Sequence, residues 1–381
     1  MAKIITIINN KGGVGKTSSC TTIGTILGIL GYKCLIVDND FQSNTTATLL
    51  TENDTIEGTI IDLFTMSKYD KESFEHSVIH TVYTNVDLIP ACPEHVATND
   101  YLKSLPAGQT NKQLKKALDL VQDEYDFIII DTHPDLYLST TNALYCSNYV
   151  ITPVGADGYS FQGTAPIANF ILNAASETET GTDSNPDLVF LGAFITNAEV
   201  RTSLYKNYYR FYQEQLGEDF IPICIRRDSA VGAVPSWLIP LPYLLGYKEY
   251  RAVAKWKGIY DYIDLMREIG MITEYDYVLA RSIFEVADGN FILNLKKANG
   301  EVEISSVALA KGVRDDFQNK YAEEHSYNYK SLVNEVNNNE ELRRDIKNGV
   351  ITTMDEDRII KIVPHEDKNK KFPYIKVKEL K

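Results

Sequence analysis

The sequence predicts an α/β protein with a mostly parallel β-sheet covered by helices on both faces, followed by a small α+β domain. Two observations predict the sheet: seven short apolar runs rich in β-branched residues, and longer helical patterns between them. Strands that are apolar along their whole length are typical of sheets buried on both sides, where helices connect parallel strands. The predicted strands are residues 4–10, 33–40, 86–91, 127–131, 149–154, 188–196 and 221–227.

Three helices follow from the same pattern. Residues 17–30 form a helix that ends at Gly31, and residues 111–124 form another between two strands. Residues 247–269 carry apolar side chains at helical spacing and are expected to pack on the sheet. The polar stretch 176–186 predicts an exposed loop.

The pattern changes after Gly270. An Asn-Gly pair at 299–300 lies between two alternating runs, which indicates a hairpin. A charged helical region at about 313–347 and two short strands, 358–363 and 374–377, complete the chain. We therefore predict two domains, residues 1–270 and residues 271–381.

Composition narrows the class of protein. The chain has 381 residues, of which 44% are hydrophobic, and a formal charge of −14, with −12 in residues 1–270 and −2 in residues 271–381. Such an acidic body binds nucleic acid poorly unless its basic groups cluster. The apolar runs are too short to span a membrane, and residues 3–10 are interpreted as a strand rather than a secretory leader.

The five cysteines are scattered and form no C-x-x-C pair, which is typical of reduced thiols in a cytosolic protein. They are Cys20, Cys34, Cys92, Cys146 and Cys224.

Residues 11–17, Lys-Gly-Gly-Val-Gly-Lys-Thr, lie between the first strand and the first helix. Glycines let backbone N–H groups point inward, and the helix N-terminus favours an anion. Lys16 is expected to neutralise the β- and γ-phosphates of a nucleotide, and the Thr17 hydroxyl to ligate Mg²⁺. The predicted nucleotide-binding residues of this loop are Lys11, Gly12, Gly13, Val14, Gly15, Lys16, Thr17 and Ser18.

The loop departs from the usual phosphate loop, because Asn10 takes the first glycine position and Lys11 precedes the paired glycines. In this it resembles the deviant Walker A motif of the ParA/MinD family of P-loop ATPases. The resemblance implies an ATPase with ATP and Mg²⁺ as cofactors, in which Lys11 reaches the phosphates of a partner subunit across a nucleotide-sandwich homodimer. Lys11, Lys16 and Asp40 are then the predicted catalytic residues.

Two further segments resemble motifs of this family. Residues 35–44 match hydrophobic-Asp-x-Asp-Pro-Gln-x-Asn, with Phe41 in place of proline. The match implies that Asp40 orients the attacking water and that Asp38 supports the Mg²⁺ shell. Residues 125–131 resemble a Walker B strand, which implies that Asp131 holds Mg²⁺. The next residue but one, His133, replaces a proline of the family and is interpreted as a loop residue near the nucleotide, rather than a metal ligand or an acid–base group.

The likeness continues to about residue 270. Residues 199–204 resemble Asp-x-Arg-Thr-x-Leu, and Arg227 with Asp228 lies where the family has its adenine-contacting turn. Arg201 is the matched basic residue for DNA, and Arg226 and Arg251 are weaker candidates, as are Lys255 and Lys257.

The leading hypothesis is a short ParA-type switch without its own helix-turn-helix: a homodimer that binds DNA non-specifically and segregates plasmid or chromosomal DNA with a ParB-like partner. We expect it in the cytoplasm, on the nucleoid if it binds DNA, and not at the membrane, because the last ten residues alternate like a strand. The alternative is a ParA-like ATPase that positions a protein cargo, in a mobile-element or defence system, through residues 271–381. A third option is a metabolic phosphotransferase, but Lys11 argues against it, because such an enzyme does not need a lysine that reaches a partner subunit.

Overall fold

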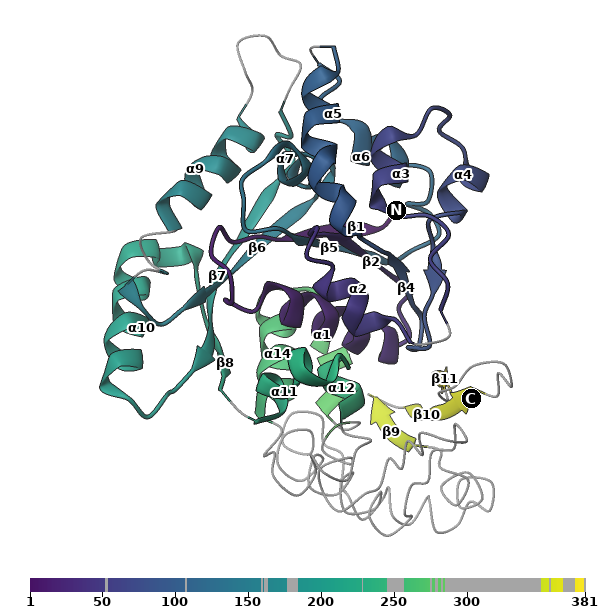
Figure 1. Cartoon of the computed structure of the whole chain (residues 1–381). Coiled ribbons are helices and arrows are strands. Elements are labelled where there is room, and N and C mark those ends of the chain that lie inside the picture. Colours follow the sequence, from purple (N-terminus) through teal and green to yellow (C-terminus); the bar gives the residue numbers. More distant parts are fainter. Residues whose placement is uncertain are drawn as a thin grey trace.

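The computed structural model describes residues 1–284, apart from 52–53, 107, 159, 161–163, 177–183, 228, 245–256, 275, 278–279 and 282–283, and the later segments 351–355, 358–365 and 374–379. Eight strands form one sheet in the order β3-β4-β2-β5-β1-β6-β7-β8. Every neighbouring pair is parallel except β3 and β4. Figure 1 shows this sheet between two layers of helices, as the sequence predicts.

All seven predicted strands are confirmed, with shifts of at most three residues at their ends. The additional strand, β3, has two residues and lies at the edge of the sheet. The strands are β1 (Lys3–Ile7), β2 (Cys34–Asn39), β3 (Ile79–His80), β4 (Val86–Ile89), β5 (Phe127–Thr132), β6 (Tyr149–Gly155), β7 (Val189–Ala198) and β8 (Phe220–Arg226).

The helices cover both faces of the sheet because successive strand residues point in opposite directions. In β1, Ile5 and Ile7 pack in one core cluster, whereas Ile4 packs in another. The first cluster faces α1 (Lys16–Ile29), α2 (Asn44–Leu49), α11 (Ser229–Trp237), α12 (Leu241–Leu244) and α14 (Lys257–Glu268). The opposite layer holds α3 (Ile60–Thr65), α4 (Lys71–Glu75), α5 (Thr98–Ser104), α6 (Gln113–Leu118), α7 (Leu138–Cys146) and α9 (Thr164–Ala175).

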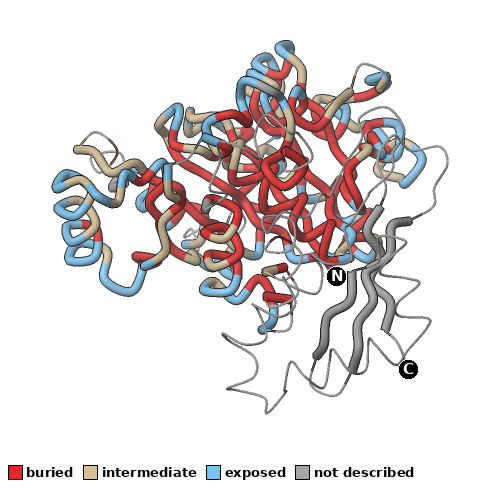
Figure 2. Tube along the Cα trace, turned by 90° about the horizontal axis from the view of Figure 1, so that it is seen from below, coloured by how far each residue is buried: buried red, intermediate tan, exposed pale blue. Residues whose placement is uncertain are grey.

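Helix α10 (Ser203–Leu216) flanks the β8 edge, and the short 3₁₀ helices Pro93–Ala97 and Gly217–Asp219 complete the connections. The central strands and α1 are almost wholly buried, as the red tube of Figure 2 shows. Among the described residues, no helix is both long and apolar enough to cross a membrane.

Helix α1 packs closely against the segment that precedes β4. A Cβ atom added to Gly28 would lie 2.1 Å from the carbonyl oxygen of Thr84, so only glycine fits there. The helix ends as predicted at Gly31, which has a φ of +99°, and the N–H of Tyr32 returns to the carbonyl of Leu27. This close packing holds the N-terminus of α1 firmly at the end of the phosphate loop.

Residues 247–256 of the predicted helix 247–269 lie outside the described residues. The rest of it is α14, and Ile263 and Met266 pack in the core as expected. Residues just after the predicted boundary at 270 also pack in the core of the sheet and its helices. Met271, Ile272 and Phe284 are buried in the same core cluster as α1, and the Tyr32 hydroxyl donates a hydrogen bond to Asp276. The apolar side chains of these residues therefore complete the core cluster that includes α1 and α14.

Three later strands form a separate antiparallel sheet in the order β11-β10-β9. They are β9 (Ile351–Asp355), β10 (Arg358–His365) and β11 (Tyr374–Glu379). The last two coincide with the predicted strands 358–363 and 374–377. The predicted hairpin at 299–300 and the charged region 313–347 lie outside the described residues.

Candidate functional site

The candidate site lies where β1, β2 and β5 end. In a parallel sheet the carboxyl ends of the strands share one edge, and ligands bind in the crevice outside that edge. Strand β1 leads into the phosphate loop, β2 ends beside Asp38 and Asp40, and β5 carries Asp131. The register pairs Asp38 with Asp131 and Ile7 with Asp131. The three predicted motifs therefore meet in space.

The phosphate loop is open to a ligand on its inner side. Gly13 and Gly15 have φ angles of +78° and +86°, which favour glycine. A Cβ atom built on Gly12 or Gly13 would meet no atom within 4 Å, so space is available against the backbone. From the other side, the Thr196 hydroxyl of β7 donates to the carbonyl of Val14 at 2.7 Å and fixes the loop.

Lys16 is the buried cation of the site. Its side chain lies at the start of α1, and its ammonium group donates to the carbonyl of Lys11 at 3.2 Å. Burial lowers the pKa of Lys16, although the carboxylates of Asp131 and Asp40 oppose this change. The ammonium group is thus held within the loop and close to the acidic residues.

Asp131 is buried with one oxygen satisfied and one free. Its Oδ2 accepts hydrogen bonds from the hydroxyls of Thr17 and Thr45, each at 2.7 Å. Its Oδ1 is buried and has no hydrogen-bond partner. Burial raises the pKa of Asp131 to about 6, while these hydroxyls and Lys16 lower it. An unpartnered, buried carboxylate oxygen beside a threonine hydroxyl is a suitable place for a bound cation.

Asp38 lies beneath this carboxylate and is held by α2. Its Oδ2 accepts from the backbone N–H of Thr46 at 2.8 Å and from the Thr46 hydroxyl at 2.7 Å. Burial, together with the charge of Asp131, raises the pKa of Asp38. Because its oxygens already accept hydrogen bonds, Asp38 supports the site from behind.

Asp40 faces a cavity. Its Oδ1 accepts from the backbone N–H of Gln42 at 2.8 Å, which orients the carboxylate. Together with Lys16, Thr17, Ser18 and His133 it lines a cavity of about 380 Å³ on this side of the phosphate loop. A carboxylate at the wall of such a cavity can hold a water molecule opposite the loop.

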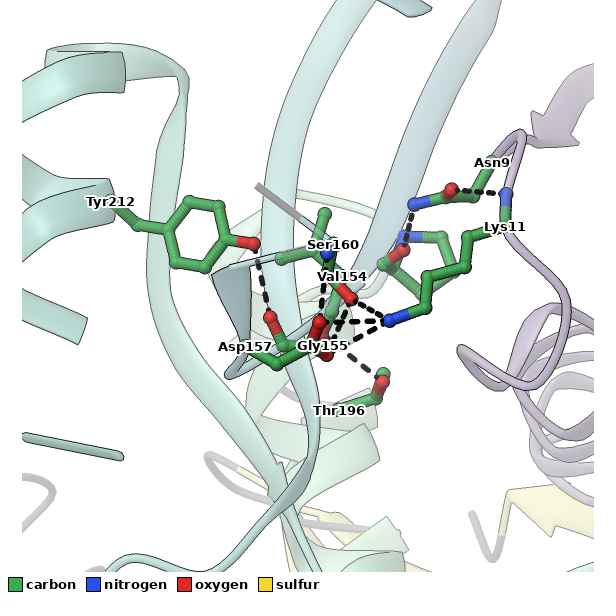
Figure 3. A network of polar contacts seen from close by, with 9 residues as sticks. Asn9, Lys11, Val154, Gly155, Asp157, Ser160, Thr196 and Tyr212 are labelled. Carbon is green, nitrogen blue, oxygen red and sulfur yellow. Dashed lines mark hydrogen bonds and ion pairs between the residues drawn. The ribbon is translucent and has the colours of Figure 1, made fainter. Parts of the chain in front are cut away.

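Lys11 points away from this cavity. Its ammonium group lies 2.9 and 3.0 Å from the two carboxylate oxygens of Asp157 and 2.8 Å from the hydroxyl of Ser160 (Figure 3). Burial raises the pKa of Asp157, but the bonds from Lys11 and Ser160 outweigh it and lower that pKa overall. In this single chain, Lys11 therefore pairs with a residue that follows β6.

Asn9 sets the start of the loop. Its side-chain oxygen accepts from the backbone N–H of Lys11 at 2.8 Å, and its amide donates to the carbonyl of Pro153 at 2.7 Å. Asn9 thus connects the phosphate loop to β6, close to the chain segment that carries Asp157.

The other predicted contacts lie on this second side. Arg227 follows β8 and pairs with Glu199; both line a second cavity, of about 300 Å³, with Lys11 and Asp157. The predicted adenine contact Asp228 lies outside the described residues, as do Arg251 and Lys255. The structure therefore brings Arg227 close to the loop.

The basic residues proposed for DNA occupy different environments. Arg201 is exposed before α10. The guanidinium group of Arg226 pairs with both carboxylate oxygens of the buried Asp261, and this pair connects β8 to α14. DNA binding by Arg226 stays a prediction, and it would require the guanidinium group to leave Asp261. Lys257 begins α14.

Sequence reasoning missed Asn9, Thr45, Thr46, Asp157 and Ser160. The two threonines directly follow the second family motif, where hydroxyl groups near two aspartates were a usable signal. Asp157 follows the predicted strand 149–154, at the edge of the sheet where ligands bind. No local pattern pairs it with Lys11, because 146 positions separate them.

The residues present fit a nucleotide with Mg²⁺. The open loop with Lys16 suits phosphates, and Thr17 with the free oxygen of Asp131 suits the cation. Within the described residues, no three His, Cys, Asp or Glu side chains are arranged to hold a metal by themselves. This agrees with Mg²⁺, which takes few protein ligands and completes its shell with phosphate and water.

The fold and the loop define the class of the protein as a P-loop nucleotide-binding protein with the extra lysine of the deviant motif. A family model described as "AAA domain" matches residues 2–184. The sporulation initiation inhibitor protein Soj of Bacillus subtilis is 30% identical over 259 residues, which are 67% of this chain and 98% of Soj. The chromosome-partitioning ATPase Soj of Treponema pallidum is 28% identical and covers 63% of this chain and 89% of that protein.

Among solved structures, a cobyrinic acid a,c-diamide synthase of Mycobacterium smegmatis with bound ADP and magnesium is 25% identical. The match has a TM-score of 0.54 and covers 62% of this chain and 93% of that one. The chain therefore belongs to the ParA/MinD family of P-loop ATPases. The family and fold predictions are confirmed.

Proposed function

We propose that this protein is an ATP-dependent, dimerising switch that hydrolyses ATP to segregate or position plasmid or chromosomal DNA. The observation that supports it best is the separation of two lysines within one loop. Lys16 serves the chain's own phosphate cavity, so Lys11 is not needed there. Lys11 is held by a surface ion pair with Asp157, whose side chain is 41% exposed, and can leave it to bind a second subunit's phosphates.

The loop and its neighbours would bind ATP with Mg²⁺. Backbone N–H groups of residues 12–17 would receive the phosphates, and Lys16 would neutralise the β- and γ-phosphates. Thr17 and Asp131 would hold Mg²⁺, with Asp38 behind them. The bound metal supplies positive charge that offsets the charge developing on the phosphates. Arg227 and Asp228 are the proposed base contacts.

Asp40 would carry the hydrolytic role. Its carboxylate lines the cavity beside Lys16 and is oriented by Gln42, so it can hold water in line with the terminal phosphate. Lys11 from the partner subunit would stabilise charge in the transition state, as cationic groups supplied in trans do in other phosphoryl transfers. Hydrolysis would then depend on dimerisation.

DNA is the proposed cargo, with a ParB-like protein as the partner that stimulates hydrolysis. The name of the Treponema pallidum relative supports this choice over a protein cargo. Arg201, exposed just before α10, is the preferred DNA contact. We place the protein in the cytoplasm and, when it is bound to DNA, on the nucleoid.

The Asp40→Ala variant tests the switch. We expect it to bind ATP with Mg²⁺ and to form a long-lived dimer, while hydrolysis falls by a factor of about 100 or more. Light scattering after gel filtration with ATP reports the dimer, and phosphate release reports hydrolysis. A variant with normal hydrolysis would exclude Asp40 from catalysis.

DNA binding is tested with the same trapped dimer in a gel-shift assay at low and at physiological salt. We expect ATP-dependent binding that weakens as salt rises, because phosphate contacts release counterions. Arg201→Ala should weaken binding, with Arg210→Ala, which changes an exposed arginine within α10, as the matched control. Absence of a shift at low salt with ATP would exclude DNA as the cargo.

A further inference from the structure

Two departures from the family pattern, Phe41 and His133, contact each other. Phe41 follows β2 and His133 follows β5, and these strands are paired with Asn39 opposite Thr132. The two rings stack with their centroids 3.9 Å apart and their planes 26° apart. The side chain of His133 is only 14% exposed. The imidazole is therefore held in one orientation by an aromatic neighbour that the family's proline does not supply.

Backbone contacts determine which nitrogen of His133 carries a proton. The N–H of Asp135 donates to Nδ1 at 3.1 Å, which requires a lone pair on Nδ1 and places the ring proton on Nε2. With Nδ1 as the acceptor, Nε2 carries the ring proton and is a hydrogen-bond donor.

This donor faces the phosphate cavity. Among the described residues, the carboxylate oxygen that faces Nε2 is Asp40 Oδ1, at 3.9 Å, which is beyond hydrogen-bond distance. His133 lines the same cavity as Lys16, Thr17 and Asp40. A preoriented N–H without an acceptor, beside a lysine and a threonine that suit phosphate and Mg²⁺, fits an oxygen of the ligand.

We propose that His133 binds the terminal phosphate of ATP through Nε2–H, so that the protein distinguishes ATP from ADP at this residue, and that Phe41 positions the imidazole. This inference rests on the proposed ATP site. ADP has no terminal phosphate, so its affinity does not depend on this contact. Asp40, 3.9 Å away, stays free to hold water.

The test compares the dissociation constants of Mg-ADP and of a non-hydrolysable Mg-ATP analogue by calorimetry on the full-length chain. All variants carry Lys11→Ala, because dimerisation would otherwise add to the apparent affinity for the ATP analogue. His133→Ala should weaken binding of the analogue roughly tenfold or more, the loss expected for a hydrogen bond to a charged group, and change ADP binding less than twofold.

Two matched variants separate hydrogen bonding from packing. His133→Gln retains a side-chain N–H and should recover most of the affinity for the analogue. Phe41→Leu retains apolar volume without the stacked ring and should lie between wild type and His133→Ala. Unchanged ADP affinity shows that each variant is folded.

An independent measurement uses protein labelled with ¹⁵N at its histidines, with the His133 signals assigned from their absence in His133→Gln. The Nε2 resonance of His133 should move on addition of the Mg-ATP analogue and much less with Mg-ADP.

The inference is overturned if His133→Ala weakens both nucleotides equally, if it weakens neither, or if the Nε2 resonance ignores the analogue. In those cases the proposed ATP site still stands. A Lys16→Ala protein that binds nucleotide as well as wild type would instead remove the proposed site, and the inference with it.

Discussion

Two lysines lie on opposite sides of the phosphate loop, one buried and the other partly exposed. Lys16 is buried, bonded to its own loop and influenced by the charges of Asp131, Asp40 and Asp135. Lys11, five positions earlier, is 35% exposed and held mainly by the similarly exposed Asp157. Burial makes an ionic contact hard to replace, whereas a surface pair exchanges at little cost. The difference supports our proposal that Lys16 belongs to a permanent binding site and Lys11 to a reversible contact.

The largest expected effect comes from replacing each of the two lysines with alanine in turn. Lys16→Ala should weaken binding of Mg-ATP to the monomer by a factor of about 100 or more, because it removes a charge-assisted phosphate contact and leaves buried carboxylates uncompensated. Lys11→Ala should change monomer binding less than about threefold while preventing dimerisation. Calorimetry and light scattering measure the two effects. Equal losses of monomer affinity in the two variants would contradict the proposed difference between Lys16 and Lys11.

The next effect concerns stability and the buried carboxylate of Asp131, whose charge acts on Lys16. Asp131→Asn should raise the free energy of unfolding in Mg²⁺-free buffer at pH 8 by on the order of 2 kcal/mol, because it removes a buried charge. Burial raises the pKa of Asp131 to about 6 from 3.8, so the folded wild type gains stability as pH falls through 6. The advantage of the variant should therefore shrink toward pH 5.

Urea unfolding at pH 8 and pH 5 measures this change, and the same variant should lose Mg²⁺-dependent nucleotide binding. Thr45→Val, which removes one hydroxyl donor to Asp131 and no charge, is the control. A gain that is independent of pH would mean that the carboxylate charge is not its cause.

The smallest effect is expected on the other side of the loop. Asp157→Asn should change the urea midpoint little, because exposed ion pairs contribute less than about 1 kcal/mol. By releasing Lys11 it should strengthen dimer formation with an ATP analogue by about two- to fivefold.

Sedimentation measures the dimer, with Glu199→Gln as a control that removes a carboxylate from the same cavity without touching Lys11. Weaker dimer formation would show that Asp157 itself serves the dimer.

Much of the fold was predictable because its signals are local. The seven strands are continuous apolar runs, and the phosphate loop is a contiguous motif between a strand and a helix. Strand β3 escaped prediction because two residues carry no periodicity, and only pairing with β4 makes them a strand. The burial of Met271 and Phe284, beyond the predicted boundary at 270, was not predictable, because it depends on the surface of α1 and α14 and not on their own sequence.

The candidate site was likewise predictable only in part. The sequence alone determined which groups are present: Lys11, Lys16, Asp38, Asp40 and Asp131 are each recognisable from neighbouring residues. Tertiary structure alone decided their partners. Strand order brings β5 between β1 and β2 and places β6 beside β1, so that Asp131 meets Thr45, Lys11 meets Asp157, and Phe41 stacks on His133. These contacts join segments far apart in the chain, and a crossover connection leaves no local signal of which strand will be its neighbour.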